Sequence, residues 1–220
     1  MPLQRDAVAR TALALLDSVG LDGLTMRRLA EELGVQNPAL YWHFRNKQDL
    51  LDHMAAAMLA DALATIEPPD ATESWAEWLA GVARAFRAAL LSYRDGARVI
   101  AGANLGRSIV PEVFDTALRV LQRAGLSPAV SLSGVLTIFA YTLAAAFDAQ
   151  TDPFHPPVEA RPGGFVALRG VIDPARLPTL AATLDDVARA TPQRDRTTDF
   201  ADGLRLILAG MGTSAAQDAR

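Results

Sequence analysis

The sequence has no cysteine, so it can form neither disulfide bonds nor cysteine-ligated metal sites, and it has no thiol nucleophile. It has only three histidines, and His43, His53 and His155 lack the spacing of metal-binding pairs. We therefore expect no metal ion or other cofactor. The formal charge of −4 argues against a protein that coats nucleic acid through bulk positive charge, so any contact with DNA must be local.

The chain also lacks the apolar start of a secretory signal, because charged Arg5 and Asp6 come almost at once. We therefore expect a cytoplasmic protein. Residues 124–147 carry no charge and are numerous enough to cross a bilayer. Their hydroxyl-bearing members, and the lack of aromatic or basic belts at their ends, favour a helix buried on all sides of a protein that does not enter the membrane.

Alanine and leucine are abundant, and no segment alternates apolar and polar residues as a strand does, so the sequence predicts an all-α fold. The periodicity predicts helices over about 5–19, 26–33, 38–43, 47–66, 74–92, 96–103, 110–124, 128–149, 174–190 and 198–212. The residues expected to end helices are Gly20, Gly34 and Gly125, and those expected to cap them are Thr25, Asn37 and Ser127.

Two stretches rich in proline interrupt this pattern. Paired prolines at 68 and 69 predict a boundary over residues 67–73, between a small N-terminal unit and a larger C-terminal one. Prolines and glycines between residues 150 and 173 predict a long loop.

Residues 25–47 have the form of a helix-turn-helix. Ala30 is small enough for close helix packing, and Gly34 suits a left-handed turn. Once Val35, Leu40 and Phe44 are assigned to the space between the helices, a short segment still carries many polar and aromatic groups, namely Gln36, Asn37, Ala39, Tyr41, Trp42 and His43. Such a surface needs a partner, unless the unit is an ordinary helical hairpin in which Tyr41 and Trp42 pack inward.

These side chains suit double-stranded DNA. Asparagine and glutamine can bind adenine edges, and Ala39 can contact a thymine methyl group. The side chains suited to phosphates or to a guanine are Arg27, Tyr41, His43 and Lys47, the last being the only lysine of the chain.

The segments LTMRRLAEELGV at 24–35 and YWHFRNK at 41–47 closely resemble the DNA-binding domain of the TetR family of regulators. The segments ESW at 73–75 and FRAALLSYRDGAR at 86–98 are similar to the ligand-binding domain of the tetracycline-binding members. The resemblance implies a DNA-binding domain at 1–47, a connecting helix at 48–66 and a ligand-binding and dimerisation domain at 67–220. It implies an all-α homodimer that is released from a palindromic operator by a small effector. It places the DNA contacts on Arg27, Gln36, Asn37, Pro38, Ala39, Tyr41, Trp42, His43 and Lys47.

The sequence departs from the tetracycline-binding members in the predicted ligand cavity. Where those proteins hold a magnesium-bound drug through polar groups, this chain keeps Phe86 but otherwise has Leu63, Val82, Ile100, Ala103 and Ala117. Asp148 matches an acidic position, but one carboxylate without an imidazole at position 100 cannot build that magnesium site. We therefore predict a largely hydrophobic or aromatic effector, with candidate polar anchors at Asn104, Thr137, Tyr141 and Asp148.

Some of these residues have simpler interpretations. Thr137 and Tyr141 can bond backbone carbonyl groups, and Asp148 can pair with an arginine or with a second subunit. An apolar stripe at Phe200, Leu204, Ile207, Leu208 and Met211, together with small Ala140, Ala144 and Ala145, predicts a four-helix dimer interface unless both surfaces are intrachain core.

The sequence predicts a ligand-responsive transcriptional repressor and not an enzyme, because no candidate catalytic group has an evident partner. Two other interpretations stay open. One is an all-α carrier or enzyme that does not bind DNA, and the other is a TetR-like activator.

Overall fold

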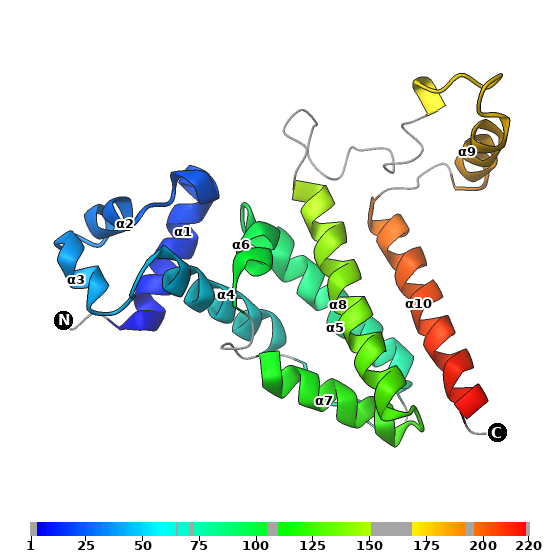
Figure 1. Ribbon diagram of the computed structural model, residues 1–220, viewed down its shortest axis with the longest axis horizontal. Helices are drawn as coiled ribbons and strands as arrows, with labels where there is room; N and C mark the ends of the chain where they lie inside the picture. Colours follow the sequence, from blue (N-terminus) through cyan, green and yellow to red (C-terminus); the bar gives the residue numbers. More distant parts are fainter. Residues whose placement is uncertain are drawn as a thin grey trace.

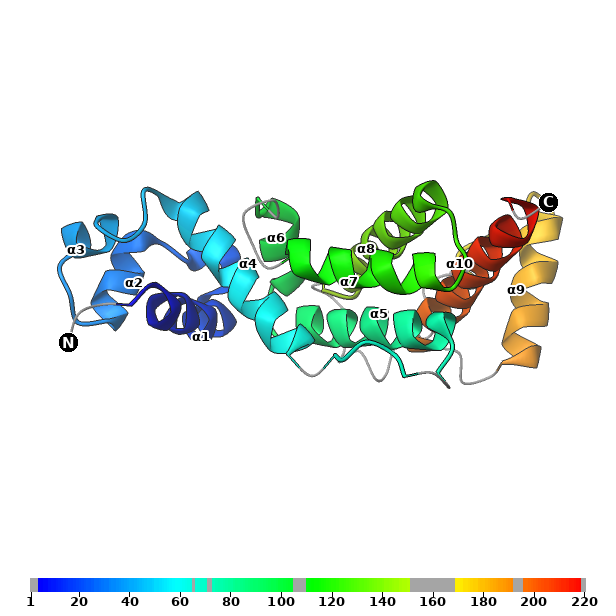
Figure 2. The same ribbon diagram turned by 90° about the horizontal axis from the view of Figure 1, so that it is seen from below.

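The computed structural model describes residues 4–64, 66–70, 73–104, 110–150, 169–191 and 196–218. Within these residues the fold is helical, as the sequence predicts. The helices are α1 (Arg5–Gly23), α2 (Met26–Glu32), α3 (Asn37–Tyr41), α4 (Lys47–Leu63), α5 (Trp75–Leu91), α6 (Gly96–Gly102), α7 (Val110–Arg123), α8 (Pro128–Gln150), α9 (Pro178–Ala190) and α10 (Arg196–Asp218). Figures 1 and 2 show α1–α3 at one end, α4 leading away from them, and α5, α7, α8 and α10 forming the other end.

The helix-turn-helix forms because local signals agree with one another. The Thr25 side chain accepts a hydrogen bond from the backbone N–H of Arg28 and so caps α2. At the other end of α2, Gly34 has a φ of 65°, and the N–H of Val35 donates to the carbonyl of Ala30. The same arrangement recurs between α7 and α8, where Gly125 has a φ of 90° and Ser127 caps α8. These predicted stops and caps are confirmed.

Some predicted helix ends are wrong. Gly20 does interrupt α1 as predicted, since its φ of 69° is not helical, but a further helical turn follows this kink and continues to Gly23. Asn37 is the first residue of α3 and not its cap, since Gln36 takes the N-cap position. The helix predicted from residue 174 begins at Pro178, because the N–H groups of Arg176 and Leu177 bond the carbonyl of Asp173 in a separate turn. The predicted loop 150–173 lies mostly outside the described residues.

The buried side chains form two hydrophobic clusters. The first joins α1–α4 to parts of α5, α6 and α8, and it includes fully buried Leu16, Leu40, Phe44, Met54 and Ile100. The second lies among α5, α7, α8 and α10. The core of the N-terminal helices therefore continues past the prolines at 68 and 69 into the C-terminal half of the chain.

The apolar stripe of α10 belongs to the second cluster. Phe200, Leu204, Leu208 and Met211 are buried within the chain's own fold. The close approach of α10 to α8 depends on glycine, because a Cβ at Gly203 would overlap the ring and hydroxyl of Tyr141. The stripe is therefore intrachain core and is not free to form the interface that the sequence predicts.

The uncharged helix α8 is not buried on all sides, contrary to expectation. Leu132, Leu136 and Phe147 on one of its faces are between 41% and 47% exposed. Among the described residues α8 is the one helix long and apolar enough to cross a membrane. Because core helices of soluble proteins pass the same test, this is weak evidence for a membrane span.

Gly96 provides a test of the tight turn between α5 and α6. A Cβ at Gly96 would overlap the backbone carbonyl oxygen of Leu90, whereas a Cβ at Gly102, in the last turn of α6, would meet no atom of the described residues within 4 Å. We expect Gly96→Ala to destabilise the fold by about 1–3 kcal/mol, because backbone must move to admit the methyl group. Thermal unfolding followed by circular dichroism checks this. Gly102→Ala is the control, and an equal melting temperature for both variants would contradict the packing described.

Candidate DNA-binding surface and ligand cavity

The short helix α3 keeps its apolar residues inside and exposes its aromatic ones. Leu40 and Phe44 are fully buried, so they fix α3 against α1, α2 and α4. Trp42, by contrast, is 87% exposed and Tyr41 is 49% exposed. The alternative in which these two side chains pack inward is therefore wrong. An exposed tryptophan and tyrosine side by side form a surface able to contact a partner.

The other predicted DNA contacts lie around this aromatic pair. Gln36 and Pro38 are exposed at the start of α3, while Asn37, Ala39 and His43 are half-buried. Asn37 Oδ1 is buried and has no hydrogen-bond partner among the described residues.

The two cationic residues predicted to contact DNA have partners of their own. Arg27 on α2 is exposed and pairs with Glu31 at 2.9 Å. Lys47 begins α4, and its Nζ donates to the carbonyl of Leu21 at 3.0 Å. Lys47 is therefore held at the junction of α1 and α4, whereas Arg27 extends into solvent.

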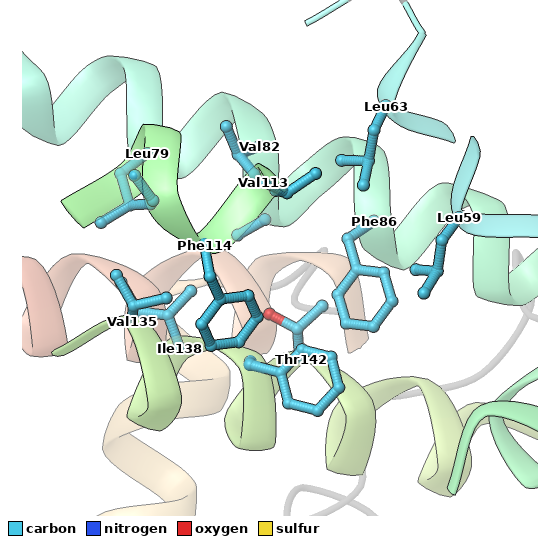
Figure 3. Close-up of a pocket in the computed structure, with 13 residues that line it drawn as sticks. Leu59, Leu63, Leu79, Val82, Phe86, Val113, Phe114, Val135, Ile138 and Thr142 are labelled. Atoms are coloured by element: carbon cyan, nitrogen blue, oxygen red, sulfur yellow. The ribbon is translucent and has the colours of Figure 1, made fainter. Parts of the chain in front are cut away.

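A cavity of about 70 Å³ lies between α4, α5, α7 and α8. Apart from the hydroxyl of Thr142, every side chain in its wall ends in carbon (Figure 3). The wall comprises Leu59, Leu63, Leu79, Val82, Ala83, Phe86, Val113, Phe114, Ala117, Val135, Ile138, Phe139 and Thr142. A cavity of about 150 Å³ holds one benzene ring, so this cavity must widen to admit an aromatic molecule.

Three phenylalanines narrow the cavity. The rings of Phe86 and Phe139 are stacked, with centroids 5.2 Å apart and an angle of 13° between their planes. Phe114 meets the ring of Phe139 edge-on at 6.1 Å. Such ring contacts are individually weak, so the rings can separate around another flat molecule that offers the same contacts.

The cavity lies where the two hydrophobic clusters meet. Leu59 and Phe86 belong to the first cluster, whereas Leu79, Val135 and Ile138 belong to the second. Leu59 and Leu63 come from α4, the helix that begins beside the proposed DNA surface. The helix α4 therefore contributes part of the cavity wall.

A second hollow adjoins this cavity and shares Leu63, Val82 and Val113 with it. Its other lining residues include Glu112, Thr116 and Trp78. The indole N–H of Trp78 donates to the carbonyl of Glu67 at 2.7 Å. Polar groups are thus available on one side of an otherwise apolar site.

Four of the ten predicted ligand residues, Leu63, Val82, Phe86 and Ala117, line the cavity. The structure places the other six elsewhere, and those residues are Ile100, Ala103, Asn104, Thr137, Tyr141 and Asp148.

These six residues are either buried elsewhere in the core, hydrogen-bonded to other helices, or exposed. Ile100 is fully buried in the first cluster, with Ala103 packed against it, and the N–H of Asn104 donates to Asp52. On α8, Thr137 and Asp148 are on the exposed face. The Tyr141 hydroxyl donates toward the carbonyls of Asp199 and Phe200 on α10, and burial raises its pKa.

Thr142, which the sequence analysis did not predict as a ligand residue, is the one polar residue among those that line the cavity.

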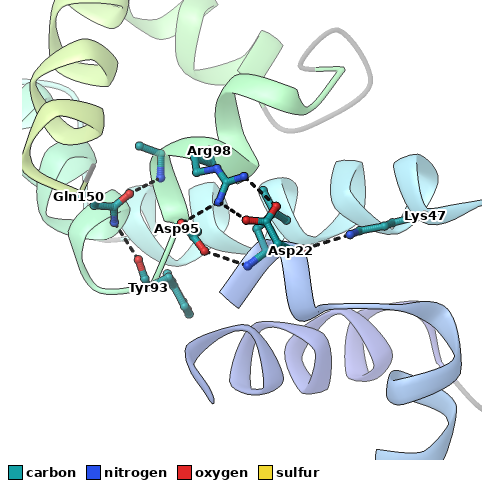
Figure 4. Close-up of polar contacts among 8 residues, drawn as sticks. Asp22, Lys47, Tyr93, Asp95, Arg98 and Gln150 are labelled. Carbon is teal, nitrogen blue, oxygen red and sulfur yellow. Dashed lines mark hydrogen bonds and ion pairs between the residues drawn. The ribbon is translucent and has the colours of Figure 1, made fainter. Parts of the chain in front are cut away.

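A polar network ties the DNA-binding end to the cavity end (Figure 4). Asp95, in a left-handed conformation with a φ of 58°, accepts a hydrogen bond from the N–H of Leu21 at 2.8 Å. Arg98 donates to Asp95 and also to Asp22, which follows the kink in α1. The network thus joins α1 to the start of α6.

Gln150 holds the other side of the same turn. Its Nε2 donates to the carbonyls of Leu90 and Tyr93, and its Oε1 accepts from the N–H of Ala97. The end of α8, whose buried face lines the cavity, is therefore bonded to the turn that contacts α1.

Two family models match this chain. The model described as "Bacterial regulatory proteins, tetR family" matches residues 9–54, and "Tetracyclin repressor-like, C-terminal domain" matches residues 67–215. The tetracycline repressor protein class A from transposon 1721 of Escherichia coli is 43% identical over 95% of this chain and 90% of its own length.

Solved structures show the same relationship. A possible TetR family transcriptional regulator from Streptomyces coelicolor A3(2) is 36% identical, with a TM-score of 0.80, over 96% of this chain and 99% of its own. A TetR variant from Acinetobacter baumannii AYE in complex with minocycline is 34% identical, with a TM-score of 0.72, over 96% of this chain and 94% of its own.

The pair of Asp22 and Arg98 provides a test of the network. The side-chain hydrogen bond from Arg98 lowers the pKa of Asp22 from its ordinary value of 3.8. A lowered pKa means that the pair stabilises the folded state above about pH 4 and loses that effect as the pH falls through the folded-state pKa. We expect the NMR titration midpoint of Asp22 to rise toward 3.8 in Arg98→Gln.

Asp185 is the internal control, since Arg169 lowers its pKa in the same way at a distant site. Its midpoint should not change in Arg98→Gln. An unchanged midpoint for Asp22 would contradict the contact between α1 and α6.

Proposed function

Because the chain belongs to the TetR family of ligand-responsive transcriptional repressors, we propose that it binds a near-palindromic operator as a homodimer and leaves it when a small apolar effector enters the cavity. The observation that carries this proposal is the exposure of Tyr41, the last residue of α3, and of its C-cap residue Trp42 (87%), while Leu40 of the same helix is fully buried. Exposed aromatic side chains add no stability to a monomer that has no partner. A helix that binds in the major groove, by contrast, needs exposed side chains to contact the DNA.

The proposed DNA contacts divide by chemistry. Gln36 and Asn37 at the start of α3 are suited to adenine edges, and Ala39 to a thymine methyl group. Arg27, Tyr41, Trp42, His43 and Lys47 surround these residues and are suited to the phosphate backbone or to a guanine. Pro38 completes the first turn of α3.

We infer that the dimer forms through the exposed faces of α8 and α10. Both helices turn their buried residues toward α5 and toward each other, so their exposed residues lie on the side away from α5. This side carries Leu132, Leu136 and Leu206, the last 65% exposed, together with small Ala140 and Ala144. Small residues allow close approach of a second pair of helices, and the leucines supply apolar area.

The dimer sets the spacing of the two α3 helices. Two such helices that enter successive major grooves must lie roughly 34–36 Å apart, or a multiple of this distance. An effector that widens the cavity pushes on Leu59 and Leu63 and so tilts α4, which carries the DNA-binding helices. The effector shifts the equilibrium only to the extent that it binds the tilted form more tightly.

The effector we propose is not a magnesium-bound tetracycline. Magnesium requires oxygen ligands, and the cavity wall supplies a single threonine hydroxyl. Asp148, the acidic residue that the sequence resemblance suggests for this role, does not line the cavity of its own chain. A largely hydrophobic or aromatic molecule fits the wall better.

We also infer that the protein is not an enzyme. Among the described residues that line the cavity, the threonine hydroxyl has no histidine, carboxylate or lysine beside it to act as a base.

The DNA-binding proposal is tested by enrichment. The purified protein should retain a near-palindromic sequence from a pool of random duplexes. Trp42→Ala should bind that sequence at least about tenfold more weakly at fixed, moderate salt, because the largest exposed side chain of the surface is lost. Electrophoretic mobility shift assays measure the affinity. Val171→Ala, which truncates a side chain that is 78% exposed elsewhere, should bind as the wild type does. Retention indifferent to sequence would overturn the proposal.

The dimer surface is tested by placing a charge in it. Leu136→Glu should raise the dimer dissociation constant at least about tenfold, because the carboxylate would be buried without a partner. Sedimentation at several concentrations measures this constant. Ala88→Glu, on an exposed face of α5, should leave it unchanged. Equal constants for the two variants would exclude this face of α8 as the interface.

A further inference from the structure

Thr142 has a buried hydroxyl for which the described part of the chain provides no partner. Its exposed fraction is 0%, and its Oγ1 has no hydrogen-bond partner among the described residues. A hydroxyl that is removed from water without a new partner destabilises the folded state. Packing alone therefore favours valine at this position, and the hydroxyl requires another explanation.

The ordinary partner of a helical threonine is the backbone carbonyl one turn earlier. Other threonines of this chain use it, since Thr11 donates to Ala7 and Thr183 donates to Thr179. Thr213 donates to the carbonyl of Gly210 in a similar way. Thr142 departs from this behaviour, and its oxygen instead points into the cavity between the rings of Phe114 and Phe86 (Figure 3).

The surroundings of this hydroxyl specify what it can bind. The stacked rings of Phe86 and Phe139 and the edge of Phe114 favour a flat molecule between them. The remaining lining of the cavity is aliphatic, so Thr142 supplies its one side-chain hydrogen bond, while the polar groups of Glu112 and Thr116 line the adjoining hollow. A hydroxyl can both donate and accept, so it matches one hydroxyl or one carbonyl group on such a molecule.

We propose that Thr142 is the polar anchor of the effector, and that the effector is a flat aromatic molecule with one hydroxyl or ketone oxygen directed at Oγ1. This inference rests on the proposed function, because it assigns the ligand class of the same cavity. The apolar wall supplies affinity, and the one hydrogen bond selects an oxygenated ring over the corresponding hydrocarbon.

The test uses probes matched in shape. Phenol and toluene differ by a hydroxyl in place of a methyl group, and 1-naphthol and 1-methylnaphthalene form a larger pair. Isothermal titration calorimetry on the full chain measures their dissociation constants. The wild type should bind the hydroxylated member of a pair about three- to tenfold more tightly than the methylated one. In Thr142→Val this preference should disappear, and in Thr142→Ser it should return.

Ser131→Ala is the matched control. Ser131 is on the same helix, and its hydroxyl is also fully buried without a partner among the described residues, but it does not line the cavity. Its removal should leave the preference for phenol and 1-naphthol unchanged. Circular dichroism establishes that each variant is folded.

Two results would overturn the inference. One is the failure of all four probes to bind the wild type up to their solubility limits. The other is an unchanged preference in folded Thr142→Val. Operator affinity without any probe is measured in parallel on the wild type and on Ser131→Ala, and it should be the same in both. Loss of specific DNA binding in the wild type would instead count against the proposed function, whatever the probes do.

Discussion

Side chains of α4 belong both to the core of the DNA-binding end and to the wall of the cavity. The position of this one helix therefore affects both sites. Leu50 and Met54 are fully buried among α1–α3, while Leu59 and Leu63 form part of the cavity wall. Each fully buried side chain contributes about 1.5–3 kcal/mol, so neither end of α4 can detach without a large loss of stability. Protein interiors are also close-packed. A molecule added at one end must therefore move the helix as a body over its length of roughly 25 Å.

The polar network at the turn between α5 and α6 complements this apolar connection. In most of its hydrogen bonds one partner is a backbone group, such as the N–H of Leu21 or the carbonyls that accept from Gln150. These bonds therefore depend on the backbone conformation and not on the identity of the side chain at that position. Asp95 adopts a conformation that is uncommon for residues other than glycine, and its bonds to Leu21 and Arg98 stabilise that conformation. The network fixes the kinked end of α1 against α6. The first half of α4 is bonded to the end of α6 as well, because Gln48 donates to the carbonyl of Gly102 and Asp52 accepts from the N–H of Asn104.

The sequence predicts much of this fold because several signals are local. The stop at Gly34 and the cap at Thr25 each depend on residues within one turn of helix. The cavity was harder to predict, because α8 is apolar on most of its surface and so does not reveal which face is inward. Thr137, one of the four predicted anchors, is exposed, while Thr142, five residues later, faces the cavity. Similarly, the stripe on α10 is apolar whether it contacts its own chain or a second copy. The spacing of Ser131, Val135 and Ile138 ahead of Thr142 is the one sequence signal that could have indicated the inward face.

The placement of the tryptophans gives the protein a built-in optical signal. Trp42 is almost fully surrounded by water, so its fluorescence lies at long wavelength and is sensitive to whatever covers α3. Trp78 is buried beside the cavity, with its indole nitrogen bonded to Glu67, and so emits at shorter wavelength. Once the third tryptophan, half-buried Trp75 at the start of α5, is replaced by phenylalanine, these two emissions separate events at the two ends of one chain. Occupancy of the cavity and occupancy of the DNA surface can therefore be followed in the same cuvette, without any attached label.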